Sequence, residues 1–323
     1  MVRVLQSLPR IRACPVELFR VSEAEDTGLR LRGDPGYHRV RPGVYTPAPA
    51  WNELRPWDRY LVRVHALHLV RPDAILCLES AAVLIGQPIF GEPRDIHIFD
   101  PDRASSTRSG DVCIHTSADR RAVVEMDGAL VTSIVDTALD LIRVLPPALG
   151  LAVADATVGR DFGVPLDELR DAAASQQNRR GRRRLDWVLE HADGSAESVG
   201  ESVSRAVIDW WGFERPELQV EFHYEGCRDR GDFYWRRIRH VGEFDGEKKY
   251  HGLTAEEIRR IVIAEKNREN RLRRHEGGMI RWDWKDALRA TPVRDRLLAA
   301  GVRQERPIQR AMLLTLRTHP RSY

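Results

Sequence analysis

Three carboxylates stand close together in the stretch GDFYWRRIRHVGEFDGEKKY, residues 231 to 250. Glu243 and Asp245 are two positions apart, so on a β-strand their side chains project from the same face. Asp232 lies on the preceding predicted strand, and the short connection RRIR favours an antiparallel hairpin with Asp232 across from Glu243. Grouped carboxylates resist joint ionisation unless a cation joins them. The pattern therefore predicts a site for Mg²⁺ or Mn²⁺ with Asp232, Glu243 and Asp245 as its ligands.

A divalent cation at such a site could ready a water molecule for attack on a phosphodiester and offset charge on the leaving oxygen. Lys248 and Lys249 follow the acids closely and are the first lysines in a chain whose positive charge comes almost wholly from arginine. A compact ammonium suits contact with the attacking water or the phosphate, which makes Lys249 a catalytic candidate and Lys248 a DNA-binding candidate. Alternatively, GEKKYHG is a charged, exposed turn without a catalytic role.

Another carboxylate, Glu265, lies on a helix predicted over residues 254–274. It shares one stripe of that helix, expected to pack inward, with four apolar residues, Ile258, Ile261, Val262 and Leu272. A buried carboxylate without a partner is costly, so Glu265 should either meet an arginine or face the metal site. Of these two possibilities, the ion pair with an arginine is preferred.

A run of arginines, NRRGRRR, occupies residues 178–184. Five guanidinium groups can contact the phosphates of a nucleic acid, and such contacts give an affinity that is independent of sequence and weakens with salt. The predicted nucleic-acid-binding residues are Arg179, Arg180, Arg182, Arg183 and Arg184, together with Lys248. A solvated helix start or linker is the alternative.

The elements that must position these residues are clearest in the C-terminal part of the chain. Hydrophobic periodicity and turn residues predict a helix over 197–211, strands over 218–224, 231–235 and 240–245, the helix over 254–274, and a strand at MIRWDW. The predicted order is αβββαβ.

The N-terminal half gives weaker signals. GYHRVRPGVYTPA predicts a short basic hairpin that turns at Pro42-Gly43, either the wing of a winged-helix-like segment over 1–50 or a hairpin that caps the next domain. Residues 51–150 are predicted as an α/β domain with strands at RDIHIFDP and DVCIHTS and a helix capped by Thr132 or Ser133. We expect a helical basic linker over 151–195, a domain with the αβββαβ order over 196–300 and a tail over 301–323.

Composition sets outer limits. A length of 323 residues exceeds what one hydrophobic core usually serves, and 42% hydrophobic with 31% charged residues is typical of a globular protein. The net charge of +3 is too small to indicate a nucleic-acid partner without the local arginine run. The four cysteines form no C-x-x-C pair, which disfavours a zinc site or a disulfide framework. No signal peptide or membrane span is predicted, so we expect a cytoplasmic protein without a membrane partner.

The αβββαβ order, with Asp232 followed by Glu243-Phe244-Asp245, resembles the PD-(D/E)XK nuclease core. GDFYW, VGEFDGEKKYHG, AEKNRENRLRR and MIRWDW resemble its Vsr-like branch in actinobacterial proteins. RPGVYTP, LESAAVLIGQPIFGEP and VTSIVDTALDLIR are similar to an AbiEi-antitoxin-like N-terminal region, so the resemblance spans most of the chain. It implies a mixed α/β fold with a restriction-endonuclease-like core. Asp232 and Glu243 would be metal ligands, Glu201 the acid of the first core helix, and Lys249 the basic residue.

In the family motif a lysine stands two residues after the second acid, where this chain has Asp245. Catalysis would then need Lys248 or Lys249 in the basic role. The preferred expectation is a DNA-interacting, Mg²⁺- or Mn²⁺-dependent endonuclease. The alternative is a DNA-binding regulator of antitoxin type with a degenerate nuclease fold and a toxin or a second copy as partner. A third reading is an interaction module that touches no nucleic acid.

Overall fold

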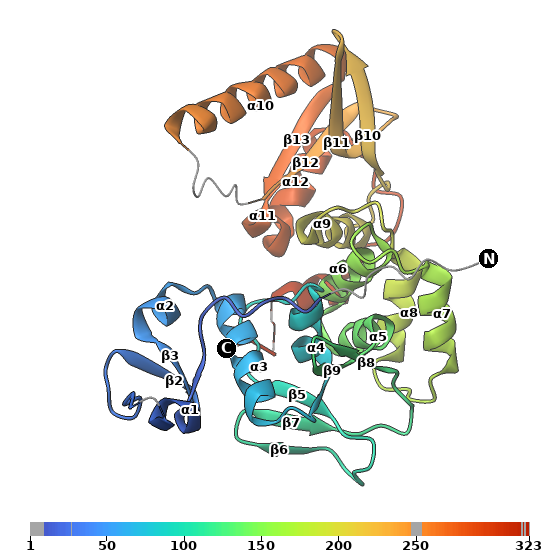
Figure 1. The fold of residues 1–323 in the computed structure, drawn as a ribbon. Helices are drawn as coiled ribbons and strands as arrows, with labels where there is room; N and C mark the ends of the chain where they lie inside the picture. The colour runs from blue at the N-terminus through green and yellow to red at the C-terminus, as the bar shows by residue number, and fades with distance from the viewer. Residues whose placement is uncertain (1–9, 27, 247–253, 318, 320, 323) are drawn as a thin grey trace, which may run out of the picture. The chain divides into compact units, whose positions relative to one another are not determined.

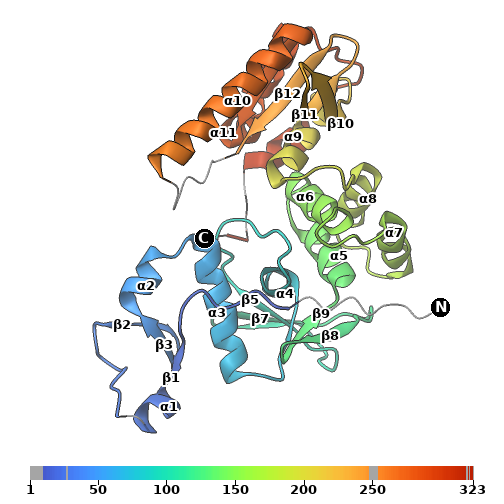
Figure 2. The same cartoon turned by 45° about the horizontal axis from the view of Figure 1, so that its top comes forward.

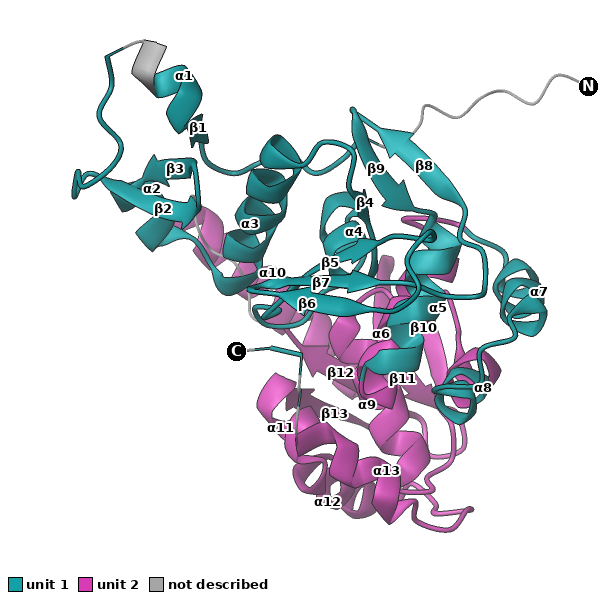
Figure 3. Ribbon diagram, turned by 90° about the horizontal axis from the view of Figure 1, so that it is seen from below, with its two compact units in different colours: residues 1–145, 164–186, 319–323 teal, residues 146–163, 187–318 magenta. Residues whose placement is uncertain are grey.

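The computed structural model describes residues 10–26, 28–246, 254–317, 319 and 321–322. The chain builds two compact units and passes between them after residues 145, 163, 186 and 318. Unit 1 holds residues 1–145, 164–186 and 319–323, and unit 2 holds residues 146–163 and 187–318 (Figure 3). Each unit combines helices with at least one β-sheet, so the predicted mixed α/β class is confirmed.

Unit 1 begins with a three-stranded sheet in the order β1-β3-β2. The predicted basic hairpin is present, because β2 (Tyr37–Arg41) pairs antiparallel with β3 (Val44–Pro47) and Gly43 takes φ 82° in the turn between them. Glycine adopts this left-handed conformation without steric cost, which is why the Pro-Gly signal located the turn. The remaining elements of this part are β1 (Phe19–Arg20), α1 (Val21–Asp26) and α2 (Ala48–Glu53).

The larger sheet of unit 1 has six strands in the order β6-β7-β5-β4-β9-β8. These are β4 (Ile75–Leu76), β5 (Ile96–Phe99), β6 (Thr107–Ser109), β7 (Val112–His115), β8 (Val123–Met126) and β9 (Ala129–Thr132). The predicted strands RDIHIFDP and DVCIHTS correspond to β5 and β7, which run parallel. The helices are α3 (Pro56–Val70), α4 (Leu78–Ile85), α5 (Ile134–Val144) and α7 (Leu166–Ser175). Ser133 caps α5 by accepting a hydrogen bond from N of Asp136.

Unit 2 contains the predicted αβββαβ order. Its elements are α9 (Val199–Trp210), β10 (Glu217–Tyr224), β11 (Cys227–Trp235), β12 (His240–Asp245), α10 (Ala255–His275) and β13 (Gly278–Asp283). The sheet order is β10-β11-β12-β13, in which β12 and β13 are parallel and the other neighbours antiparallel. Helix α6 (Pro147–Val158) packs against α9. Helix α8 (Arg182–His191) runs from unit 1 into unit 2.

The two faces of the unit 2 sheet differ in character. One face carries Phe244 and Trp282, and Nε1 of Trp282 donates to Oγ of Ser204 on α9 over 2.7 Å. On the other face Val241 packs with Leu272 of α10. Because side chains alternate along a strand, Glu243 and Asp245 share the α10 face with Val241. Figures 1 and 2 show α9 and α10 with the sheet between them.

The stripe of α10 that was expected to pack inward is only partly buried. Leu272 is buried, but Ile261 and Val262 are 41% and 47% exposed, so the prediction is wrong for these two residues. The contacts of α10 with the sheet come from its C-terminal half, where Arg268 and Arg271 also lie. Periodicity therefore identified a helix face without showing how far along the helix a covering layer extends.

Residues 284–317 continue unit 2 as α11 (Trp284–Arg289), α12 (Thr291–Ala299), α13 (Arg310–Leu314) and a 3₁₀ turn (Thr315–Arg317). The described residues of the segment predicted as a tail make tertiary contacts, because Arg306 pairs with Asp209 in unit 2 and Arg321 pairs with Glu79 in unit 1. The segment 151–195, predicted as a linker, likewise forms α6, α7 and α8 within the two units.

Gly200→Ala should destabilise the protein although alanine favours a helix. A Cβ at Gly200 of α9 would lie 2.0 Å from Cε1 of Phe244. Alanine gains about 1 kcal/mol of helix propensity over glycine, whereas overpacking costs about 1 to 3 kcal/mol. We expect a net loss of up to about 2 kcal/mol in the free energy of unfolding, measured by urea denaturation. Adding Phe244→Leu should restore part of it. A more stable Gly200→Ala protein would show that α9 and β12 are not this close.

Candidate functional site

A polar pocket of about 720 Å³ opens on the α10 face of the unit 2 sheet. Carboxylates and guanidinium groups line it, namely Asp229, Asp232, Glu243, Asp245, Glu265, Arg268, Arg271 and Arg281. The β11–β12 register sets Phe233 opposite Gly242, so Asp232 and Glu243 occupy the next position along the two strands. The predicted hairpin thus brings these two acids together.

Asp232 is half-buried and is held by neutral donors. Its Oδ2 accepts a hydrogen bond from N of Phe244 at 3.0 Å, and its Oδ1 accepts one from Nε2 of Gln219 at 3.5 Å. Burial, and after it the charge of Glu201, raises the pKa of Asp232 to about 6. Ionised Asp232 is therefore only partly compensated by its surroundings.

Glu201 lies in the first turn of α9 and is buried. Its Oε1 accepts from Oγ of Ser198 at 2.7 Å, and its Oε2 accepts from N of Glu197 at 2.9 Å, so it takes part in capping the helix. The same Oε2 also accepts from Nε2 of Gln219 at 2.8 Å. One amide thus links Glu201 to Asp232, and the acid predicted on the first core helix does lie beside the strand acids.

Gln219 was not identified from the sequence. It interrupts β10 with φ 52°, between the pairs Leu218–Phe233 and Val220–Gly231, and so lies opposite Asp232. The signal that could have found it is the two-residue turn Glu225-Gly226, which fixes the register of β10 against β11.

Glu243 is buried and ion-paired with Arg268 of α10. Nη2 of Arg268 donates to its Oε2 at 2.7 Å, whereas Oε1 lies 2.6 Å from Nη1 without the alignment of a hydrogen bond to any described residue. Burial raises the pKa of Glu243, although Arg268 acts in the opposite direction. We call Glu201, Asp232 and Glu243 the inner acids.

Asp245 belongs to a different group, the Arg281 cluster of Asp245, Glu265, Glu269 and Arg281. Nε of Arg281 donates to Oδ2 of Asp245 at 3.0 Å, Nη2 to Glu265 at 3.0 Å and Nη1 to Glu269 at 3.1 Å. The predicted ion pair of Glu265 with an arginine is confirmed. Asp245 shares the pocket with Asp232 and Glu243, but its carboxylate is engaged by Arg281.

The predicted three-ligand metal site is not preassembled. Among the residues that the structure describes, no group of three or more His, Cys, Asp or Glu side chains is placed to hold a metal ion. Lys248 and Lys249 lie outside the described residues. The described site thus consists of the inner acids, linked through Gln219 and partly neutralised by Arg268.

Comparison with known proteins gives a family for this chain. No family model and no solved structure matches it. Two proteins of Mycobacterium tuberculosis do match, Uncharacterized protein Rv2248 of strain H37Rv and Uncharacterized protein MT2308 of strain CDC 1551. Each is 33% identical over 187 residues, which cover 58% of this chain and 67% of the relative. The chain belongs to the family of these mycobacterial proteins.

The arginine run of this family member lies in unit 1 and consists of a loop over residues 178–181 and the first turn of α8. Nη1 of Arg182 donates to the carbonyl of Ala173 at 2.9 Å, and Nη1 of Arg184 donates to the carbonyl of Arg143 at 2.9 Å. Arg179, Arg180 and Arg183 are exposed. Two of the five predicted phosphate-contacting residues thus serve internal contacts, and three remain open to solvent.

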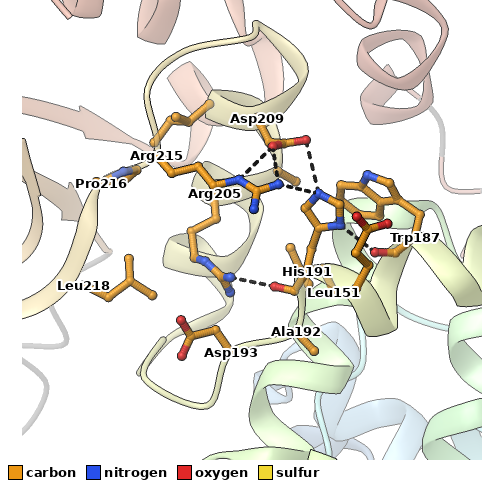
Figure 4. Close-up of a pocket in the computed structure, with 13 residues that line it drawn as sticks. Leu151, Trp187, His191, Ala192, Asp193, Arg205, Asp209, Arg215, Pro216 and Leu218 are labelled. Atoms are coloured by element: carbon orange, nitrogen blue, oxygen red, sulfur yellow. Dashed lines mark hydrogen bonds and ion pairs between the residues drawn. The ribbon is translucent and has the colours of Figure 1, made fainter. Parts of the chain in front are cut away.

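A second pocket of unit 2, of about 230 Å³, adjoins a cluster centred on Asp209. Figure 4 shows the Asp209 carboxylate facing His191 and Arg215. Burial alone would raise its pKa, but the hydrogen bond from His191 and the charge of Arg306 hold the pKa of Asp209 well below its usual range. This cluster joins α9 to the segment containing Arg306 and is structural in character.

In EDTA, Asp232→Asn should stabilise the protein at high pH and lose this effect in acid. The folded pKa of about 6 exceeds the unfolded value of about 3.9, so ionised Asp232 lowers stability above pH 6 and the loss disappears as pH falls toward 4. Asparagine keeps an oxygen acceptor for N of Phe244. We expect the variant to be more stable by about 1 to 3 kcal/mol at pH 8 and equal to the parent at pH 4, measured by urea denaturation.

Asp229→Asn is the matched control. Asp229 is buried and accepts from Nε and Nη2 of Arg271 at 2.8 and 2.6 Å. Its loss leaves a guanidinium without its partner, so this variant should be less stable than the parent by about 1 to 3 kcal/mol at pH 8. If Asp232→Asn behaves like Asp229→Asn, Asp232 is a structural acid and the interpretation of its raised pKa is wrong.

Proposed function

We propose that this protein interacts with DNA and hydrolyses phosphodiester bonds at a metal-dependent site formed by the inner acids. The observation that carries the proposal is Asp232, a half-buried carboxylate that faces a pocket beside Glu243 and is held only by neutral donors among the described residues. Such a group favours a bound cation. The αβββαβ order and its resemblance to the PD-(D/E)XK core support the same reading.

Asp232 and Glu243 suit Mg²⁺ or Mn²⁺. Proteins hold Mg²⁺ through one or two carboxylates, with water and substrate phosphates supplying the other ligands. Of the two oxygens of Glu243, only Oε2 accepts a directed hydrogen bond from a described residue, while Oε1 lies 2.6 Å from Nη1 of Arg268, with which a bound ion would share it. When bound, the ion would activate water and offset charge on the leaving oxygen. Asp245 is not included in the proposed ligand pair, because Arg281 occupies its carboxylate.

Neighbouring side chains would keep the two acids in place. Gln219 donates to both Glu201 and Asp232 and so fixes their separation. Arg268 neutralises Glu243 in the metal-free protein, which limits repulsion between Glu243 and Asp232. The basic role of Lys249 stays a prediction, since that residue lies outside the described part of the chain.

A second candidate function is a DNA-binding regulator of antitoxin type that has lost catalysis. The presence of Asp245 where the family motif has a lysine favours this second function. In this chain Asp245 belongs to the Arg281 cluster, whose ion pairs join β12, β13 and α10. A toxin or a second copy of the chain would then be the protein partner. Either function implies a cytoplasmic location. None of the described helices combines the length and apolar character needed to span a bilayer.

Incubation with supercoiled plasmid distinguishes the two functions. The purified chain should nick or linearise plasmid in millimolar Mg²⁺ or Mn²⁺ and do neither in EDTA. Asp232→Asn and Glu243→Gln should each lower the cleavage rate by at least about 100-fold, because removal of a group that stabilises developing charge typically costs this much. Plasmid topology on agarose gels reports the rate.

Glu221→Gln is the control for carboxylate removal. Glu221 pairs with Arg228 on the exposed surface of the same sheet, so its loss should leave cleavage unchanged. If the parent binds plasmid without cutting it in either metal, the result favours the DNA-binding regulator. Equal cleavage by the parent and Asp232→Asn would mean that a contaminating nuclease or another site is responsible.

DNA binding should depend on the exposed arginines. Each phosphate contact contributes roughly 0.9 to the slope of log K against log salt concentration. Because Arg179 and Arg183 are exposed, Arg179→Ala/Arg183→Ala should make the slope shallower by about 2, measured by fluorescence anisotropy with a labelled duplex. Arg184→Ala tests the arginines that make internal contacts, since Arg184 donates to the carbonyl of Arg143. Its loss should lower the melting temperature and leave the salt slope nearly unchanged. An unchanged slope in Arg179→Ala/Arg183→Ala would show that the arginine run does not contact DNA.

A further inference from the structure

Unit 1 contains a pocket of about 270 Å³ that plays no part in the proposed nuclease site. Phe99 and His115, the last residues of the parallel strands β5 and β7, line it. Ligands of open α/β sheets bind beyond the carboxyl ends of their parallel strands. The arginine loop closes the pocket on another side through Asn178 and Arg180.

The pocket contains more positive charge than its carboxylates balance. Arg121 is paired with Asp140 at 2.7 Å, and Arg321 is paired with Glu79. Arg143 is buried, yet the acceptors of its hydrogen bonds are neutral, namely Oε1 of Gln176 at 2.8 and 3.1 Å and the carbonyl of Arg180 at 2.8 Å. Burial accordingly lowers the pKa of Arg143. A buried cation without an anionic partner favours a bound anion.

Hydrogen bonds and close packing hold the loop that contains Arg180 at the edge of the unit 1 pocket. The carboxylate of Asp119 accepts from N of Gln177 at 2.7 Å and from N of Asn178 at 3.0 Å. Gly181 has φ 71°, and a Cβ there would lie 2.5 Å from the carbonyl oxygen of Arg143. Only glycine allows the loop to close this tightly on α5. These contacts hold Arg180 at the wall of the pocket, whereas its neighbour Arg179 does not line the pocket.

Hydroxyl groups complete the set of donors. Oγ of Ser106 accepts from N of Thr116, and Oγ of Ser117 accepts from N of Asp119, each at 3.1 Å, so both hydroxyl protons remain available to a ligand. Guanidinium groups match the oxygens of phosphate in geometry and charge. The pocket volume of about 270 Å³ lies just below the range of roughly 300 to 1,000 Å³ that is typical of sites for small molecules. That space admits a phosphate with one attached group and excludes a duplex.

We propose that this unit 1 pocket binds a phosphate monoester through Arg143, Arg180 and the serine hydroxyls. The phosphate belongs either to a free nucleotide or to the 5′ end of a nucleic-acid strand. The inference is independent of the nuclease proposal, because its residues lie in unit 1 and the inner acids lie in unit 2.

Calorimetric titration of the full chain tests the pocket with inorganic phosphate and with adenosine 5′-monophosphate. Arg180→Gln should weaken both affinities at least tenfold, and Arg120→Gln, the control at an exposed arginine of unit 1 that does not line the pocket, should leave them unchanged. Arg180 is exposed and contributes its carbonyl, not its side chain, to the hydrogen bond with Arg143, so the variant should fold, as a thermal melt will show. Asp232→Asn should bind phosphate as the parent does, whatever its effect on cleavage.

Two further ligands identify the source of the phosphate. Stronger binding of the mononucleotide than of adenosine or of a 5′-phosphorylated oligonucleotide indicates a free nucleotide. Stronger binding of a 5′-phosphorylated oligonucleotide than of its 5′-hydroxyl form or of the mononucleotide indicates a strand end. The proposal is overturned if phosphate shows no saturable binding, or if Arg120→Gln and Arg180→Gln weaken it equally, which would indicate diffuse attraction to a basic surface.

Discussion

A buried carboxylate requires compensation, and in both units this chain provides it mainly with arginine. Five such pairs are Glu79–Arg321, Asp155–Arg205, Asp209–Arg306, Asp229–Arg271 and Glu243–Arg268. An unpaired ionised carboxylate in a protein interior is strongly destabilising, whereas the planar guanidinium can supply two directed bonds at once. Because the partners come from distant parts of the sequence, these pairs determine where helices and C-terminal segments meet the sheets.

Asp232 and Glu201 depart from this pattern. In the described structure neither carboxylate is ion-paired, and a single amide, Gln219, donates to both. Elsewhere the chain places a guanidinium beside its buried carboxylates. Here it leaves negative charge beside a pocket without an ion-pair partner for Asp232 or Glu201 among the described residues. The departure has a cost in stability, which the raised pKa of Asp232 expresses, and sites that retain such a cost are commonly sites of ligand binding or chemistry.

Local patterns were sufficient to predict the elements and part of the site. Alternation along the strands and the short hairpin brought the two strand acids together correctly, because both features depend only on neighbouring residues. The register that places Gln219 opposite Asp232 was also available, from the turn after β10. The ion pairs made by Arg268 and Arg281 could not be predicted from the sequence, since they depend on how α10 returns the chain to a parallel strand. For the same reason, periodicity along α10 could not show that half of the helix is uncovered.

Two clusters on one sheet show why the inner acids, and not Asp245, form the candidate cation site. The inner acids with Arg268 carry a formal charge of −3 + 1 = −2, whereas the Arg281 cluster also meets Arg273, which lies 2.9 Å from Glu269, and carries −3 + 2 = −1. In the Arg281 cluster the carboxylates of Asp245, Glu265 and Glu269 are 38%, 21% and 27% exposed, and water can screen the excess. The Glu243 side chain is only 6% exposed, so solvent contributes little there. The buried excess must be relieved by a proton, as the raised pKa values of Asp232 and Glu243 indicate, or by a cation. Proton and divalent ion are therefore alternatives at one position, and above pH 6, where the proton leaves Asp232, the charge favours the ion.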